Sequence, residues 1–333
     1  MAAKVSIITA LYNHAPFVAQ AIDSVLAQTY DDWELIIWDD GSTDGGLDVV
    51  RSYVRRFPQK VFSYQHEGRG NKGQEATRNE ALRVAGGQYI CLLDSDDYWL
   101  PRKLELQVAA VEANPRVGLV YAPTQALLHD DGLVLNLSSK EPLPQGKVFD
   151  QLVRSCFIHA CSALFRRECI KGVSAPFRTQ YGCIGEYPLW LAIARDWELA
   201  TVPEPVAVWR VHGGNTSSRK RVQARRELVA MAEELAGDPA YGAHKPAIEA
   251  ALAQYRYDLG VILVEEGSGE GALAEAQALF QGLPGRKARF MGFVAGLGPG
   301  AAHALAFFKR ILFMIRDPRR AALVSAVTRS RSV

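Results

Sequence analysis

The chain has 333 residues, of which 48% are hydrophobic and 22% charged, as is typical of a globular protein. A net charge of +2 gives no strong overall field, which argues against nucleic acid as a partner. The five cysteines form no C-x-x-C pair and their number is odd, which argues against a disulfide framework and a zinc site and favours a reducing compartment. The N-terminus lacks the pattern of a signal peptide, and no apolar stretch reaches the ~20 residues of a membrane-spanning helix, so we expect a cytoplasmic protein.

Strand-like and helix-like segments alternate up to about residue 121. Short apolar runs predict strands, and apolar residues at helical spacing predict helices. The predicted strands span residues 4–10, 34–38, 61–64, 89–93 and 117–121. The predicted helices span residues 16–27, 47–57, 75–85 and 102–113. Strands separated by helices imply an α/β fold with a mostly parallel sheet and helices on both faces.

Beyond residue 128 the alternation weakens and the chain later becomes helical. Further strands are predicted at residues 133–137, 162–165 and 206–211, and a helix at 186–195. From residue 219 the sequence is rich in Ala, Leu and Glu, with predicted helices at 222–236, 246–266 and 271–280, of which the last two form a hairpin. We therefore expect a catalytic domain at 1–218 and a helical C-terminal extension at 219–333.

The acidic cluster Asp94-Ser95-Asp96-Asp97 directly follows the apolar run ICLL of a predicted buried strand. Ligands of parallel α/β sheets bind at the carboxyl ends of strands. Clustered carboxylates repel one another unless a hard cation is present, and oxygen ligands suit Mg²⁺ or Mn²⁺. The alternative is a solvated acidic turn, which the adjoining apolar run disfavours. The cluster therefore predicts a divalent-metal site.

Three stretches together resemble a family 2 glycosyltransferase with a GT-A fold: SIITALYNHAPFVAQAIDSVLAQTYDDWELIIWDDGSTDGG, ATRNEALRVAGGQYICLLDSDDYWLPRKLELQ and VWRVHGGNTSS. The resemblance covers about residues 4–218. It implies transfer of a sugar with inversion from a nucleotide-diphosphate donor to a hydroxyl acceptor, with Mn²⁺ or Mg²⁺ as cofactor. UDP is the expected nucleotide of the donor. The resemblance also implies a bacterial surface glycan, or its lipid-linked precursor, as the acceptor.

The resemblance assigns roles to residues on the donor side. Tyr12 lies against the nucleobase, where an aromatic face suits stacking. Asp40 hydrogen-bonds the base, and Arg78 lies near the nucleotide. Asp94 and Ser95 lie by the ribose and the sugar.

The resemblance also implies two metal ligands. Asp96 binds the cation that bridges the diphosphate, matching the D-x-D motif of the family. His212, in RVHGGNTSS, matches a family histidine that binds the metal or the phosphate. The structural alternative for His212 is an ordinary packed histidine.

An inverting transfer needs a base that deprotonates the acceptor hydroxyl. The family supplies it from an acidic pair at the start of a late helix, and the matching stretch here is GEYPLW. Glycine stands at the first acidic position, Gly185, and Glu186 stands where the family has aspartate. We expect Glu186 to be the base, the alternative being a carboxylate that interacts only with the helix dipole.

The C-terminal tail, residues 303–333, interleaves basic and apolar residues. Such a segment can lie in a membrane interface beside anionic lipids, or form a helix packed on the protein with its basic face in water. Two other functions remain open on the sequence. A sugar nucleotidyltransferase would need a glycine-rich phosphate loop, which ALYNHAP lacks, and a non-catalytic sugar-nucleotide binder is suggested by the altered acidic pair.

Overall fold

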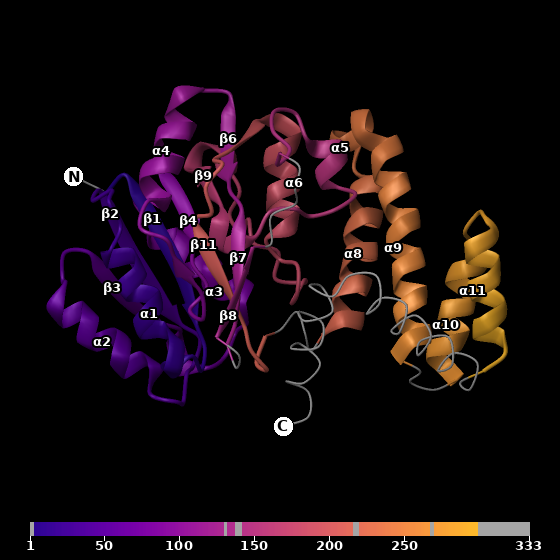
Figure 1. Ribbon diagram of the computed structural model, residues 1–333, viewed down its shortest axis with the longest axis horizontal. Helices are drawn as coiled ribbons and strands as arrows, with labels where there is room; N and C mark the ends of the chain where they lie inside the picture. The colour runs from indigo at the N-terminus through magenta and orange to yellow at the C-terminus, as the bar shows by residue number, and fades with distance from the viewer. Residues whose placement is uncertain (1–2, 130–131, 137–141, 216–219, 267–269, 299–333) are drawn as a thin grey trace. The chain divides into compact units, whose positions relative to one another are not determined.

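The computed structural model describes residues 3–129, 132–136, 142–215, 220–266 and 270–298 (Figure 1). The chain divides into two compact units. The first unit comprises residues 1–152 and 156–210, and the second comprises residues 153–155 and 211–333.

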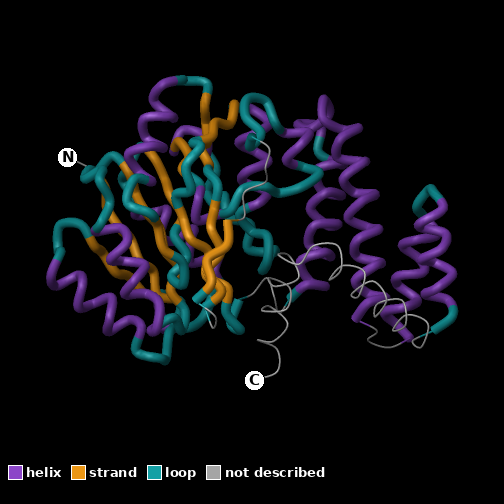
Figure 2. The backbone as a smooth tube through the Cα atoms, viewed as in Figure 1, coloured by secondary structure: helices purple, strands orange, loops and turns teal. Residues whose placement is uncertain are grey.

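A sheet forms the centre of the first unit (Figures 1 and 2). It has seven strands in the order β10-β6-β9-β4-β1-β2-β3. Its strands are β1 Val5–Leu11, β2 Trp33–Asp39, β3 Val61–Gln65, β4 Tyr89–Leu92, β6 Val117–Tyr121, β9 Leu164–Arg166 and β10 Glu198–Thr201. Only β9 is antiparallel to its neighbours, β4 and β6; every other neighbouring pair runs parallel. The predicted mostly parallel α/β sheet is confirmed.

Helices cover both faces of this sheet, which explains why its central strands β1 and β4 are mostly apolar and almost entirely buried. The helices of the first unit are α1 Ala15–Leu26, α2 Gly46–Arg56, α3 Gln74–Val84, α4 Lys103–Ala113, α5 Phe149–Leu152 and α6 Tyr187–Asp196. Alternate residues of β1, such as Val5 and Ile7, share one core with buried residues of α1, α2 and α4. Ile8 points to the other face and is also buried, and α3 packs there against β1 and β2.

Short elements complete the first unit. Single 3₁₀ turns are η1 Glu67–Arg69, η2 Ala160–Ser162 and η3 Arg167–Ile170. A second sheet has the order β5-β11-β7-β8, with β5 Tyr98–Trp99, β11 Ala207–Val211, β7 Thr124–Leu128 and β8 Leu133–Asn136. The predicted strand at 162–165 is displaced, because a 3₁₀ turn occupies residues up to Ser162 and β9 begins at Leu164.

From Arg221 onward, the described residues of the second unit form helices joined by short loops. Its elements are α8 Arg221–Gly237, η4 Pro239–His244, α9 Lys245–Glu266, α10 Glu270–Gln281 and α11 Arg286–Gly296. Helices α9, α10 and α11 share a core of apolar residues that includes Leu263, Phe280 and Met291. The three predicted helices and the hairpin pairing of α9 with α10 are confirmed, whereas α11 was not predicted.

Two sequence expectations about the C-terminal region stay predictions. The tail at 303–333 lies outside the described residues. Among the described residues, no helix is long and apolar enough to cross a membrane. The division of the chain at residue 219 stays a prediction; the second compact unit begins at Val211, the last residue of β11.

Candidate active site

The acidic cluster forms a tight turn between β4 and β5. The Asp97 amide donates to the Asp94 carbonyl at 3.0 Å, which closes the turn. Arg210 on β11 fastens the turn from outside, since its amide donates to Asp97 Oδ1 at 2.9 Å and its Nε donates to the Asp96 carbonyl at 2.8 Å. Burial, together with the neighbouring carboxylates of Asp96 and Asp94, raises the pKa of Asp97 well above its usual value. Asp97 therefore serves to hold the turn.

Arg78 on α3 brings together three carboxylates, one from its own helix and two from other parts of the chain. Its Nη2 donates to Asp94 Oδ1 at 2.6 Å, and its Nη1 donates to Glu75 Oε1 at 2.9 Å and to Glu186 Oε2 at 3.3 Å. Gln74 adds a second donor to Asp94 Oδ1, at 3.0 Å. The predicted donor-side carboxylate and the predicted base thus share one guanidinium.

The electrostatics of this cluster follow from burial. Burial opposes the charge of Arg78, but the carboxylates of Glu75, Asp94 and Glu186 outweigh it and raise the pKa of the guanidinium above its usual value. Burial, with smaller contributions from Glu186 and Asp94, raises the pKa of Glu75 to about 8, although Arg78 acts in the opposite sense. At neutral pH, Glu75 is therefore mostly an uncharged acid.

Glu186 lies at the N-cap of α6, and its side chain is 25% exposed. The buried side of the helix anchors it, because Trp190 is fully buried and meets Phe165 of β9 edge to face at 5.7 Å. Arg78 holds Oε2 of Glu186 from the protein side, so the exposed part of the carboxylate is the part that faces away from the core.

Tyr12 and Asp40 lie side by side at the ends of β1 and β2. Leu11 pairs with Asp39 in the sheet, and the Asp40 amide donates to the Leu11 carbonyl at 2.8 Å. The Tyr12 side chain is 46% exposed, as a stacking surface must be. Asp40 is buried, and its carboxylate accepts the amides of Lys72 and Gly73 at 2.6 and 3.0 Å. The roles of Tyr12 and Asp40 at a nucleobase stay predictions.

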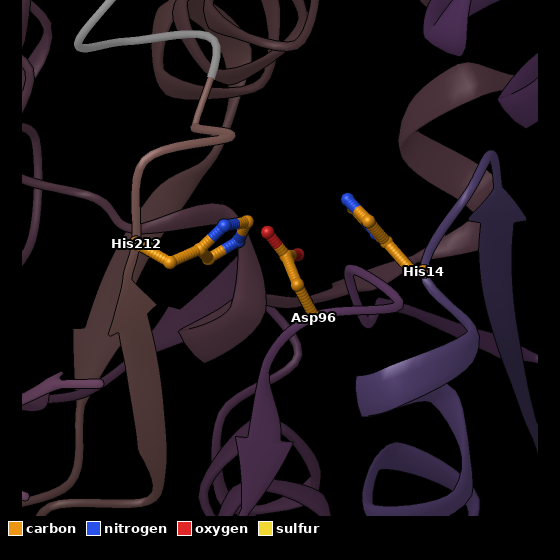
Figure 3. Close-up of side chains that lie close together, drawn as sticks. All are labelled: His14, Asp96 and His212. Carbon is orange, nitrogen blue, oxygen red and sulfur yellow. The ribbon is translucent and has the colours of Figure 1, made fainter. Parts of the chain in front are cut away.

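A possible metal-ligand set lies beside the acidic turn. Ligand atoms of His14, Asp96 and His212 all lie within 4.8 Å of one another, and Figure 3 shows Asp96 between the two imidazoles. His14 Nδ1 lies 2.8 Å from Ser95 Oγ, and the Gly214 amide donates to His212 Nδ1 at 3.1 Å. One carboxylate and two imidazoles form a donor set that fits a divalent transition metal such as Mn²⁺.

The sequence profile described as glycosyl transferase family 2 matches residues 6–173, half of the chain. The chain belongs to glycosyltransferase family 2. A family relative, the Escherichia coli UDP-Glc:α-D-GlcNAc-diphosphoundecaprenol β-1,3-glucosyltransferase WfgD, is 31% identical over 201 residues, which are 60% of this chain and 72% of WfgD.

Two solved protein structures share the fold of this chain. Staphylococcus aureus TarS (residues 1–349) aligns with a TM-score of 0.64 at 15% identity, covering 92% of this chain and 91% of TarS. The mannosyltransferase PcManGT from Pyrobaculum calidifontis, in complex with GDP-Man and Mn²⁺, aligns with a TM-score of 0.60 at 20% identity, covering 99% of this chain and 86% of PcManGT. The GT-A type architecture expected for a family 2 glycosyltransferase is thereby confirmed.

Three polar residues of the site were missed by the sequence analysis: Glu75, His14 and Arg210. Arg210 and His14 lie within stretches that carried the resemblance, VWRVH and LYNH, so their positions gave a signal. Glu75 gave none, because a glutamate in the first turn of a helix is ordinarily a solvated residue near the positive end of the helix dipole.

Proposed function

We propose that this family 2 glycosyltransferase moves a sugar from a nucleotide-diphosphate donor to a hydroxyl acceptor with inversion, and that the nucleotide of the donor is UDP. The observation that carries the proposal is the sharing of Arg78 by Asp94 and Glu186. It couples a carboxylate of the D-x-D turn to one at the start of α6. A single-displacement transfer needs such a pair, with one group on the donor side and one base on the acceptor side.

Glu186 acts as the base in this proposal. As the acceptor oxygen forms its bond to the anomeric carbon, its proton passes to Glu186, and the bond from that carbon to the diphosphate oxygen breaks. Arg78 donates a hydrogen bond to Oε2 of Glu186 and thereby fixes the direction of Oε1. Arg78 itself does not contact the acceptor in this proposal. Positioning of this kind contributes to catalysis by restricting the reacting groups to a near-attack geometry.

On the donor side, Tyr12 stacks on the base, Asp40 hydrogen-bonds it, and Asp94 with Ser95 contacts the ribose and sugar. Asp96, with His14 and His212 as further donors, would hold Mn²⁺ or Mg²⁺. Bound by these residues, such a cation would neutralise charge on the leaving diphosphate. Support comes from TarS, whose structures include complexes with UDP and with UDP-GlcNAc, and from PcManGT with GDP-Man and Mn²⁺.

The proposed acceptor is a bacterial surface glycan or its lipid-linked precursor. The support is the activity of WfgD, whose acceptor is a GlcNAc-diphosphoundecaprenol, together with its 31% identity to this chain. A lipid-linked acceptor makes contact with the membrane surface useful to the enzyme.

Helix α11 supports such peripheral membrane contact. Its exposed face carries Phe290 and Phe293, which are 55% and 63% exposed, and the C-cap residue Leu297 is 58% exposed. Three exposed cations, at residues 286, 287 and 289, accompany them, and the helix contains no acidic residue. Large apolar side chains beside cations are typical of helices that lie in an anionic membrane interface.

Vesicle flotation of the full chain tests the membrane contact. We expect the full chain to float with vesicles containing phosphatidylglycerol and the double variant Phe290→Ser/Phe293→Ser to float much less. The matched control is Leu133→Ser/Val134→Ser, which removes two similarly exposed apolar residues from β8. Equal flotation of the wild type and the α11 variant would remove α11 from the proposal.

The transfer reaction is tested with a panel of nucleotide sugars, Mn²⁺ and a polyprenyl-diphosphate sugar acceptor. We expect transfer from one donor with an inverted anomeric configuration, and a loss of at least about 100-fold in kcat for Glu186→Gln. The control Glu204→Gln changes an exposed carboxylate that pairs with Arg102. Donor binding with no turnover, and no effect of Glu186→Gln, would favour a non-catalytic sugar-nucleotide binder. Formation of a nucleotide sugar from a nucleoside triphosphate would favour a nucleotidyltransferase.

A further inference from the structure

The Glu75 side chain fills the space that a side chain on residue 185 would occupy. A Cβ atom on Gly185 would lie 2.2 Å from Glu75 Cγ and 2.3 Å from Glu75 Cδ, far inside van der Waals contact. Gly185 is not one of the glycines with positive φ, so its backbone would accept an ordinary side chain. The obstacle to a side chain at residue 185 is therefore the Glu75 side chain itself.

Neither partner is free to move away. Glu75 is 6% exposed and its Oε1 accepts from Arg78, so a displaced side chain would lose this hydrogen bond. The segment that carries Gly185 is fixed to α3 by Asn79, which donates to the Phe177 carbonyl at 2.7 Å and accepts from the Phe177 amide at 3.1 Å. Helix α3 thus holds this segment and fills the space beside Gly185.

We propose that Glu75 is a positioning residue of the transfer site. Its carboxyl group fills the volume that a side chain on residue 185 would take, and there it orients the Arg78 guanidinium that pairs with Asp94 and Glu186. This inference rests on the proposed function, because it assigns Glu75 a role through the proposed base. It also explains why the acidic pair of the family resemblance has lost its first member: the carboxyl group is delivered from α3 instead.

The protonation of Glu75 suits this role. Burial raises the pKa of Glu75 to about 8, so near neutral pH an uncharged acid accepts one N–H of Arg78. An uncharged acceptor orients the guanidinium while leaving its positive charge to Asp94 and Glu186. Oε2 of Glu75 is buried and has no hydrogen-bond partner among the described residues, so Glu75 makes no competing bond elsewhere.

The test compares full-length variants at residues 75 and 185. Glu75→Ala removes the acceptor, and we expect kcat to fall by about 10- to 100-fold with little change in the donor KM, as for a misplaced catalytic group. Glu75→Gln keeps an uncharged acceptor of the same size and should retain most of kcat. Gly185→Asp alone should lower the melting temperature, because its side chain overlaps Glu75. Glu80→Ala, at a more exposed carboxylate of the same helix, is the control.

The decisive variant is Glu75→Ala/Gly185→Asp, which returns a carboxylate to the same volume from the other element. We expect its loss in free energy of unfolding to be smaller than the sum of the losses of the two single variants. We also expect its kcat to be at least tenfold higher than that of Glu75→Ala. Additive stabilities, or a Glu75→Ala variant with wild-type kcat per folded molecule, would overturn the proposal. If the wild type transferred no sugar, the proposed function would fail, whereas the stabilities would still decide whether residues 75 and 185 share this volume.

Discussion

The buried acid Glu75 makes stability depend on pH in a defined direction. Burial raises its pKa from 4.5 to about 8 in the folded chain. Between these values the folded state holds a proton that the unfolded state releases. Stability is therefore full below pH 4.5 and declines as the pH rises toward 8. Changing Glu75 to Gln removes this proton equilibrium while preserving the size of the side chain and its acceptor for Arg78.

The magnitude follows from the displacement of the acid equilibrium. Each tenfold change in the acid dissociation constant corresponds to about 1.36 kcal/mol. The rise of the Glu75 pKa from 4.5 to about 8 therefore limits the pH-dependent loss of stability to on the order of 5 kcal/mol. Coupling with Arg78, Glu186 and Asp94 divides the effect among several groups and makes the observed change smaller. We expect the wild type to lose at least about 1 kcal/mol relative to Glu75→Gln between pH 5 and pH 8.5, or about 2–4 °C in melting temperature for a unit of this size.

Thermal denaturation at several pH values, followed by circular dichroism, measures this difference. The pH dependence of every other group cancels when wild type and Glu75→Gln are compared at the same pH. Glu80→Gln, the same chemical change at a more exposed carboxylate of α3, should follow the wild-type curve. Parallel curves for wild type and Glu75→Gln would show that Glu75 titrates normally, and would refute the reasoning from its burial.

Three further predictions address packing and the metal. Lys103→Met should keep or raise the melting temperature at pH 7, because it removes a fully buried ammonium whose pKa burial lowers; a fall of more than about 5 °C would contradict this. Gly260→Ala should destabilise the helical unit by about 1–3 kcal/mol in urea denaturation, since its Cβ would lie 2.6 Å from Phe280 Cζ, and Phe280→Leu should restore part of the loss. Wild-type stability of Gly260→Ala would show that α9 and α10 do not pack so closely. Asp96→Asn should weaken the apparent Mn²⁺ affinity in transfer assays by about 10- to 100-fold, and an unchanged Mn²⁺ half-saturation would exclude Asp96 as a ligand.

Local patterns were sufficient for most of the sheet and its helices. The strands β1, β2 and β4 are mostly apolar because both faces of the sheet are covered, and this pattern is visible in the sequence. The short strands β5, β7 and β10 were missed, because two to five residues with few apolar side chains carry little periodicity. Their pairing with distant strands makes them strands.

The same division holds for the site. The sequence by itself determined the acidic turn, since the run ICLL predicts a buried strand that ends just before Asp94, and it determined the helix start beside Glu186. Only the tertiary structure decided that Arg78 joins Asp94 to Glu186, 108 positions away from Arg78, and that Glu75 occupies the space left by Gly185. The physical reason is that these contacts depend on how α3, β4 and α6 pack around one guanidinium, and packing between elements distant in the chain leaves no periodic trace in the sequence.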